Sequence, residues 1–310
     1  MKIIEITDNQ NIQIKALLKN ISYAVAKNGN EYTRVEVADK SGSITGNVWS
    51  VVNGLKAGDI VDISGRGNLY NGKMTLAIAK ITPGTASESE LAEILPASPY
   101  GADSMWKDIE RMIASMTNEA IRTLTSAILS DVRESFIKVA AAKSFHHAGV
   151  HGLLQHTAEM ARTAEAIAPI YPVLNKDLLV AGTILHDLSK IDEYVFDSNG
   201  IATDISVEGE LFGHVFLGAE KVREYGRRLG ISEDVIIPLA HMVASHHGNL
   251  EWGAVQKPCT PEAAALWLID MISARMEMFR VEYETLQPGQ MSPNKNLGLD
   301  GIRVYRPNIQ

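Results

Sequence analysis

Seven side chains have the types and the spacing of a metal centre: His156, His186, Asp187, His214, His246, His247 and Asp270. The successive steps from His156 to His186, His214, His246 and Asp270 are 30, 28, 32 and 24 residues, about one helix and its connection each time. Antiparallel helices would bring such positions to one level of a bundle core. Imidazole nitrogens and carboxylate oxygens suit Mn²⁺ or Fe²⁺ at least as well as Zn²⁺, and this set exceeds what one ion needs.

A structural role is the alternative interpretation for each histidine of the chain. A single histidine among leucines is usually a structural residue, so the joint order and spacing of the seven decides the interpretation. Asp270 adds weight because it stands in the apolar stretch AAALWLIDMISA, where an unpaired carboxylate would be costly. His241 matches no position and is taken as structural. For His146 and His147 two interpretations stay open: they contact the ligands or the substrate, or they have a local role at the surface.

The elements that must position these ligands differ between the two ends of the chain. Residues 1–83 alternate between apolar and polar side chains and are rich in β-branched residues, which predicts about five strands. Asn71-Gly72 is a strong signal for a two-residue hairpin turn. Five strands without a long helix predict a small closed barrel, because closure removes the sheet edges.

The rest of the chain is expected to be helical. Residues 84–104 are rich in Pro, Gly, Ser and Glu and are interpreted as a linker to a domain spanning residues 105–310 with a C-terminal tail. Thr260 and Pro261 mark the clearest helix start. The fold class is therefore a multidomain β + α chain, with helices expected at roughly 105–117, 119–129, 131–142, 152–168, 176–190, 213–229, 232–247 and 261–284.

Composition excludes several classes of protein. The chain has 310 residues, 45% hydrophobic and 21% charged, which excludes a disordered protein. One cysteine, Cys259, excludes a disulfide framework and a thiolate metal cluster. Residues 1–83 have ten Lys/Arg against seven Asp/Glu, which gives this segment a net charge of +3. The rest of the chain has a net charge of −11, so the total is −8. With neither a leader-like start nor a long apolar run, we expect a cytoplasmic protein without a membrane partner.

The order His, His-Asp, His, His-His, Asp resembles the HD phosphohydrolase superfamily in its two-metal form. The resemblance implies that Asp187 bridges two ions, which hold a hydroxide between them and polarise a phosphodiester. Lys190 follows Asp187 by three residues and so lies on the same helical face. We assign it the role of a cation that neutralises charge on the phosphate, with a solvated lysine at a helix end as the alternative. The other ligands would divide into His156, His186 and Asp270 for a first ion and His214, His246 and His247 for a second.

A closer resemblance covers almost the whole chain. An N-terminal segment similar to an OB-fold precedes the segments HHAGVHGLLQHT, YPVLNKDLLVAGTILHDLSK, VEGELFGHV, SHHGNLEWGAVQKP and VYRP, a combination that resembles the YhaM family of 3′-to-5′ exoribonucleases. The resemblance implies Mn²⁺-dependent hydrolysis of single-stranded RNA, with some activity on single-stranded DNA. Ser189 departs from the glycine usual there, and residues 292–295 lack the arginine expected in the tail.

Aromatic and basic residues of the front domain are the candidates to stack bases and hold phosphates: Tyr32, Arg34, Trp49, Arg66, Asn68, Tyr70 and Lys73. Trp49 is equally compatible with the barrel core. Trp252, after the His-His pair, could stack on the terminal base or pack as an ordinary hydrophobic residue. Glu208 and Glu210 are interpreted as solvated acids.

Two other functions remain open at this point. The chain could be a phosphohydrolase of small nucleotides whose barrel serves assembly, or a non-catalytic single-strand or DNA-binding replication factor whose helical domain is a scaffold. The intact ligand set disfavours the second alternative and the barrel disfavours the first. We also expect a homo-oligomer, with residues 271–279 (MISARMEMF) as either interface or core.

Overall fold

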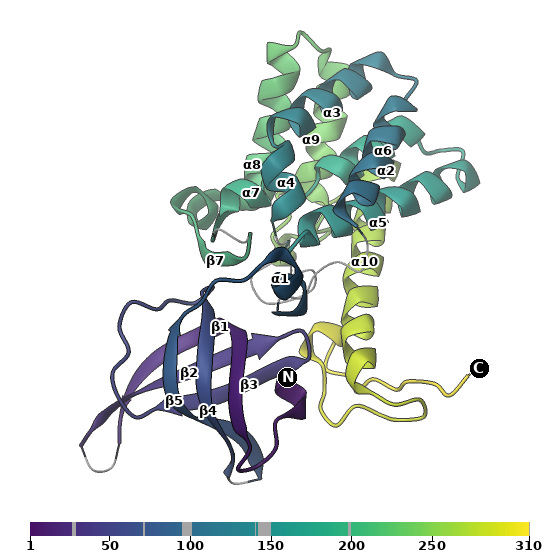
Figure 1. Cartoon of the computed structure of the whole chain (residues 1–310). Coiled ribbons are helices and arrows are strands. Elements are labelled where there is room, and N and C mark those ends of the chain that lie inside the picture. The colour runs from purple at the N-terminus through teal and green to yellow at the C-terminus, as the bar shows by residue number, and fades with distance from the viewer. Residues whose placement is uncertain are drawn as a thin grey trace. The chain divides into compact units, whose positions relative to one another are not determined.

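The computed structural model describes residues 1–26, 29–70, 72–94, 101–139, 141, 150–197 and 200–309. It divides into two compact units, Met1–Ala97 with Phe196–Thr203, and Ser98–Val195 with Asp204–Gln310 (Figure 1). His146 and His147 lie outside the described residues. No helix in the described part of the chain combines the length and apolar character that a bilayer crossing requires.

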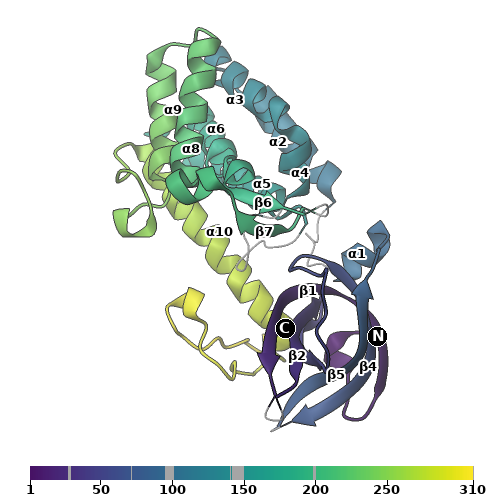
Figure 2. The ribbon, with the colours of Figure 1, turned by 90° about the vertical axis from the view of Figure 1, so that its left-hand side faces the viewer.

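The first unit is built on a closed five-stranded barrel, which Figures 1 and 2 show from two sides. Around the barrel the strands follow the order β1-β2-β3-β5-β4, and β3 and β5 are its one parallel pair. This is the five-stranded barrel predicted from the alternation, and it confirms the OB-fold class. After a short 3₁₀ turn (Ile3–Glu5), the strands are β1 (Asn11–Val25), β2 (Glu31–Asp39), β3 (Gly42–Val48), β4 (Ile60–Tyr70) and β5 (Lys73–Pro83).

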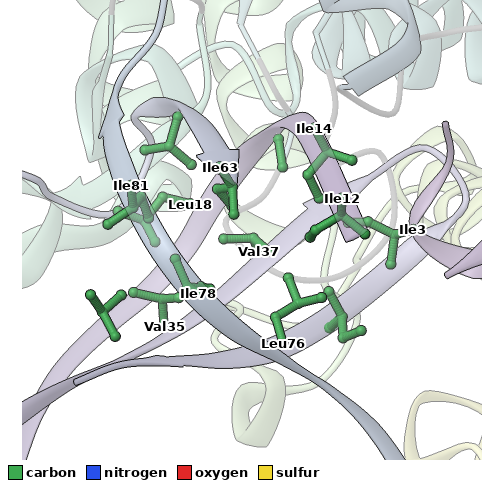
Figure 3. Close-up of a cluster of buried hydrophobic side chains, with 14 of the residues drawn as sticks. Ile3, Ile12, Ile14, Leu18, Val35, Val37, Ile63, Leu76, Ile78 and Ile81 are labelled. Carbon is green, nitrogen blue, oxygen red and sulfur yellow. The ribbon is translucent and has the colours of Figure 1, made fainter. Parts of the chain in front are cut away.

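Strand β1 closes the barrel because it is long enough to pair on both sides. Its first half, Asn11–Leu17, pairs with β4, and the part from Leu17 to Val25 pairs with β2, with an irregularity between Leu18 and Asn20. Such an irregularity bends a strand around a barrel. The inward positions fill the interior with aliphatic side chains, including Ile12, Ile14, Leu18, Val35, Val37, Ile63, Leu76, Ile78 and Ile81 (Figure 3).

The segment interpreted as a linker contains a helix, α1 (Glu88–Ile94). Its start is a capping box, because the backbone N–H of Ser87 donates to Glu90 Oε2 over 2.8 Å and the Glu90 N–H donates to Ser87 Oγ over 3.4 Å. Lys15 of β1 holds Glu90 through an ion pair of 2.9 Å. The segment interpreted as a linker is therefore helical in this part, since its Ser and Glu cap a helix.

The second unit is mainly helical, as predicted (Figure 2). Its helices are α2 (Ala102–Ala114), α3 (Glu119–Asp131), α4 (Arg133–Lys138), α5 (Gly152–Ile167), α6 (Lys176–Leu185), α7 (Lys190–Glu193), α8 (Val207–Arg228), α9 (Glu233–Ser245) and α10 (Pro261–Thr285). α5 and α6 pack against each other, α10 packs on both, and α8 packs along α9. Short 3₁₀ turns cover Ala168–Ile170, Leu250–Trp252 and Leu297–Leu299.

Some of the observed elements differ from those expected from the sequence; the helix expected over 131–142, for example, spans only Arg133–Lys138. The helix expected over 176–190 ends at Leu185, and α7 is a separate turn. The helix expected from residue 213 is preceded by a further helical segment from Val207, which the Ser206 side chain caps by accepting from the Gly209 N–H, and the two are separated by a break at Gly213. A hairpin of β6 (Tyr194–Phe196) and β7 (Ala202–Ile205), which the sequence did not predict, lies between α7 and α8.

Candidate metal centre

Five segments of the second unit deliver the seven predicted ligands to one place. His156 lies on α5, the His-Asp pair directly follows α6, His214 lies on α8, the His-His pair directly follows α9, and Asp270 lies on α10. Four imidazoles and one carboxylate are buried: His156, His186, Asp187, His214 and His246. Such burial of polar groups is favourable only when they are partnered.

Asp187 stands in the middle of this cluster. Its Oδ2 lies 3.4 Å from His156 Nε2 and 3.3 Å from His186 Nε2. Its Oδ1 lies 3.4 Å from His214 Nε2 and 3.5 Å from His246 Nε2. Each carboxylate oxygen therefore faces its own pair of histidines.

Asp270 and His247 complete the cluster, and Asp270 also groups with His186 and His246, with the ligand atoms of these three within 4.8 Å of one another. Asp270 Oδ1 lies 3.3 Å from His156 Nε2. His247 groups with His214 and His246, with all three nitrogens within 4.8 Å of one another. Neighbouring ligands at about 2.1 Å from one ion are separated by roughly 3.0–3.4 Å, so these spacings suit divalent cations.

Hydrogen bonds at Nδ1 fix the orientation of four of the imidazoles. When Nδ1 holds the proton, Nε2 presents its lone pair to an ion. The partners are Thr183 O for His186 (2.7 Å), Val243 O for His246 (2.7 Å), Ser273 Oγ for His156 (3.0 Å) and Glu193 Oε2 for His214 (2.9 Å). In each case Nε2 is the atom that faces Asp187.

Several buried ligand atoms lack a hydrogen-bond partner among the described residues: Asp187 Oδ1, His214 Nε2, His246 Nε2 and His247 Nδ1. A buried polar atom without a partner costs about 1–3 kcal/mol. Three of the four are Asp187 Oδ1 and the two Nε2 atoms that face it, those of His214 and His246. A cation on this side of Asp187 would satisfy them, so the residues present fit a metal ion.

The carboxylates of the centre are ionised. Burial opposes this for Asp187, but the charges of Lys190 and His186 hold its pKa well below the usual value. Burial also opposes ionisation of Asp270, and the hydrogen bond and charge of His156 nevertheless lower its pKa. In return, and against the effect of burial, the two carboxylates raise the pKa of His156 to about 9.

His214, His246 and His247 are neutral at physiological pH. Burial lowers the pKa of His214 and of His246, despite the nearby carboxylates. Burial and the adjacent His246 lower the pKa of His247 to about 4. Neutral imidazole is the form that binds metal ions.

Lys190 borders the centre directly. Its Nζ lies 2.7 Å from Asp187 Oδ2. Burial favours loss of its proton, but the Asp187 charge raises the pKa of Lys190 overall, so the ammonium stays charged. The sequence placed it on the helical face of the His-Asp pair, and the structure puts it in contact with the aspartate itself.

Two residues of the centre were missed by sequence reasoning, Glu193 and Ser273. Glu193 follows Lys190 by three residues, which places it on the same face of a short helix, and this was the available signal. Glu208 and Glu210 are exposed, in keeping with solvated acids. His241 lies outside the cluster, where its Nε2 accepts from the Cys259 N–H over 2.9 Å.

The predicted aromatic residues Tyr32 and Trp49 form a pair on the barrel, in which Tyr32 is half-buried and Trp49 is exposed. Their ring centroids are 5.2 Å apart at an interplanar angle of 39°. Trp49 is 68% exposed, so the alternative of a core residue was wrong. Buried Thr33 fixes the chain after Trp49, because its Oγ1 donates to Ser50 O and accepts from the Val52 N–H, both over 2.9 Å.

Strand register places the other predicted contacts on the outer surface of the same barrel. Arg34 pairs with Asn47, Asn47 with Ala77, and Ala77 with Arg66, so the two arginines lie in one row across β2, β3, β5 and β4. Neighbouring rows contain Asn68 opposite Thr75 and Tyr70 opposite Lys73, and all five predicted polar or aromatic side chains are exposed: Arg34, Arg66, Asn68, Tyr70 and Lys73.

Trp252 ends the 3₁₀ turn that follows the His-His pair and is 53% exposed. The next residue, Gly253, lies against the His247 ring, with an added Cβ 3.4 Å from His247 Nδ1. Trp252 is therefore an exposed aromatic side chain close in the chain to a ligand.

Comparison with known proteins finds one matching domain family and relatives that cover almost the whole chain. The HD domain family matches residues 153–275, which include all seven candidate ligands. A protein of Halalkalibacterium halodurans named 3′-5′ exoribonuclease YhaM is 35% identical over 298 residues, covering 94% of this chain and 92% of that protein. A protein of the same name from Listeria monocytogenes is 31% identical and covers 100% of this chain and 99% of its own. Another from Geobacillus sp. is also 31% identical and covers 96% of this chain and 92% of its own.

Among solved structures, the second OB-fold domain of replication protein A from Methanococcus maripaludis aligns with 28% of this chain and 96% of its own. The identity is 23% and the TM-score is 0.24.

Proposed function

This chain belongs to the YhaM family of 3′-5′ exoribonucleases, and we propose that it hydrolyses single-stranded RNA from the 3′ end in a metal-dependent reaction. The observation that supports this most strongly is the position of Asp187, whose two oxygens each face a separate pair of histidines. That arrangement suits a carboxylate that bridges two cations, as two-metal phosphodiester hydrolysis requires.

The proposed ligands divide into two sets that share Asp187. His156, His186 and Asp270 would bind the first ion, and His214, His246 and His247 the second. The mixture of imidazole and carboxylate favours Mn²⁺, with Fe²⁺ or another divalent ion as alternatives. When bound, the two ions supply Lewis acidity to the phosphoryl oxygens and to the attacking water.

The protein's own groups would act beside the ions. Lys190 keeps its charge at the edge of the centre, and we assign it the neutralisation of charge that develops on the phosphate. Asp187 would hold both ions with one oxygen each. The Nδ1 partners of the histidines keep the ligands oriented throughout the reaction.

We assign RNA capture to residues 1–83 and hydrolysis to residues 105–310, with residues 84–104 between them. The Tyr32 and Trp49 pair offers rings for base stacking, and the row with Arg34 and Arg66 offers guanidinium groups for phosphates. Neither kind of contact requires a 2′-hydroxyl, so we include single-stranded DNA as a further substrate. We propose a cytoplasmic location for this activity.

Trp252 is the candidate for the terminal base. It is half exposed, and the neighbouring Gly253 lies against the His247 ring. An aromatic ring at such a position would stack on the last nucleotide, worth about 1–3 kcal/mol per base.

The activity is tested with RNA labelled at its 5′ end, incubated with and without Mn²⁺. We expect a ladder that shortens from the 3′ end, depends on metal and is absent for Asp187→Ala. An RNA that stays intact yet shifts on a native gel would favour a binding protein instead. Hydrolysis of bis-p-nitrophenyl phosphate that far exceeds hydrolysis of RNA would favour a phosphohydrolase of small nucleotides.

We also propose that the protein self-associates through α10. Leu268, Ile272 and Met276 recur every four residues along one face of this helix and are 54%, 54% and 57% exposed. A second copy is the proposed partner of this stripe. Light scattering of the wild type and of Ile272→Glu tests this, and we expect the variant to have the lower mass.

A further inference from the structure

We propose that Glu193 is a positioning residue that holds His214 against Asp187, so that binding of the second ion depends on Glu193 while binding of the first does not. This inference rests on the two-ion centre proposed above. Glu193 ends α7 and His214 lies in α8, 21 residues later, so the contact joins two separate elements.

Both oxygens of Glu193 are used by one residue. Oε2 accepts from His214 Nδ1 over 2.9 Å, and Oε1 accepts from the His214 backbone N–H over 3.1 Å. The two side chains are 13% and 11% exposed. A carboxylate that receives both the ring and the backbone of a residue fixes the direction of its remaining nitrogen, here the Nε2 that faces Asp187.

A break in α8 makes this contact necessary. Gly213 has φ 69° and ψ 156°, a conformation open almost only to glycine, in the middle of an otherwise helical segment. The backbone N–H of His214 therefore turns away from the helix and towards Glu193. His186 and His246 differ, because their Nδ1 atoms donate to carbonyls three residues earlier in their own segments.

The backbone of Glu193 also anchors the first turn of α8. Its carbonyl accepts from the Ser206 N–H over 2.8 Å, and a Cβ added to Gly209 would lie 2.3 Å from the same oxygen. Glu193 thus contacts α8 before the break at Gly213, through Ser206 and Gly209, and after it, through His214. Disturbing this contact is expected to move His214 and to leave His156, His186 and Asp270 in place.

The test counts bound ions in the full-length protein without RNA. Stripped protein is dialysed against a series of free Mn²⁺ concentrations, and bound manganese is measured by elemental analysis. The wild type should bind two ions. Glu193→Gln, which removes the charge and one acceptor, should bind one ion normally and the other 10–100-fold more weakly. The matched control, Glu208→Gln, alters an exposed acid in the first turn of α8 and should bind as the wild type does.

Two glycine substitutions, one at the break in α8 and one after its end, give a second measurement. Gly213→Ala should weaken the same single ion, because alanine strains the turn before His214. Gly230→Ala strains a residue with φ 68° just after the other end of α8, where nothing lies within 4 Å, and should bind both ions normally.

The outcomes separate this inference from the function on which it rests. If the wild type binds two ions and Glu193→Gln binds both equally well, the positioning role is overturned and the exonuclease proposal stands. Loss of both ions together would also overturn it, because Glu193 would then support the whole centre. A wild type that binds fewer than two ions would overturn the two-ion centre and this inference with it.

Discussion

The ammonium of Lys190 lies 2.7 Å from Oδ2 of Asp187, the same oxygen that faces His156 and His186. Lys190 is therefore placed beside the carboxylate on which both proposed ions would depend. Its ammonium thus lies at the border of the ligand set without belonging to the proposed ligands.

Replacing Lys190 with methionine should lower kcat by about 10²–10³-fold, because a preorganised charge near the developing negative charge is lost. The number of bound Mn²⁺ ions should stay at two, since no ligand is removed. Steady-state hydrolysis of RNA, combined with elemental analysis, checks both statements. Activity within twofold of the wild type would show that Lys190 only balances the charge of Asp187.

Metal binding should release a proton from the first-ion side. His156 has a pKa of about 9, so it is protonated at pH 7, and it must lose that proton to bind an ion. The histidines of the other side have lowered pKa values and release none. Titration calorimetry of Mn²⁺ in buffers with different ionisation enthalpies should give about one proton per protein. Buffer-independent heats would contradict this.

Stability of the metal-free protein should peak near pH 6.5. Below this value the unfolded chain takes up protons at His214, His246 and His247 that the folded chain does not, so stability falls with falling pH. Above it the folded chain keeps a proton on His156 that the unfolded chain loses. That contribution, on the order of 2–3 kcal/mol, is complete below pH 6.5 and is lost as pH rises through 9.

Urea unfolding from pH 5 to pH 9 measures this profile. With saturating Mn²⁺ the decline between pH 6.5 and pH 9 should disappear, because the proton has already left. A metal-free protein whose stability rises steadily to pH 9 would exclude the raised pKa of His156.

The order of the ligands was predictable from the sequence, and their orientation was not. The spacing from His156 to Asp270 shows which elements can meet, because one helix and its connection separate each pair. Glu193 was missed because its partner lies beyond a hairpin that the sequence did not predict. An acid at the end of a short helix is indistinguishable in sequence from a solvated one.

The alternation of inward and outward side chains along β3 could have predicted that Trp49 is exposed. Ile44, Gly46 and Val48 point into the barrel, so the next residue belongs to the outer face. Trp49 was left open as a core residue because tryptophan is large and apolar. The parity of the strand decides its direction, whatever the size of the side chain.

Trp49→Ala should weaken binding of single-stranded RNA by about tenfold or more, because stacking on one aromatic ring contributes about 1–3 kcal/mol per base. Fluorescence anisotropy with a labelled oligonucleotide and the Asp187→Ala background measures binding without cleavage. Tyr171→Ala removes another exposed aromatic residue and should bind normally. Equal affinities for the two variants would exclude the Tyr32 and Trp49 pair as a base-binding surface.

Ser189→Ala should be neutral or stabilise the protein by about 1 kcal/mol. The hydroxyl of Ser189 is fully buried and has no hydrogen-bond partner within the described ranges, so its removal abolishes a desolvation cost. Thermal unfolding checks this, with Thr183→Ala as a contrast, because the Thr183 hydroxyl donates to Leu179 O over 2.7 Å. Loss of stability in Ser189→Ala would reveal a partner for the hydroxyl.

The bridging role of Asp187 is tested most directly by anomalous diffraction at the manganese edge from crystals of the Mn²⁺-loaded protein. We expect two peaks about 3.5–4 Å apart, one near each oxygen of Asp187. The first should lie near His156, His186 and Asp270, and the second near His214, His246 and His247. A single peak, or two peaks that Asp187 does not join, would contradict the two-ion centre.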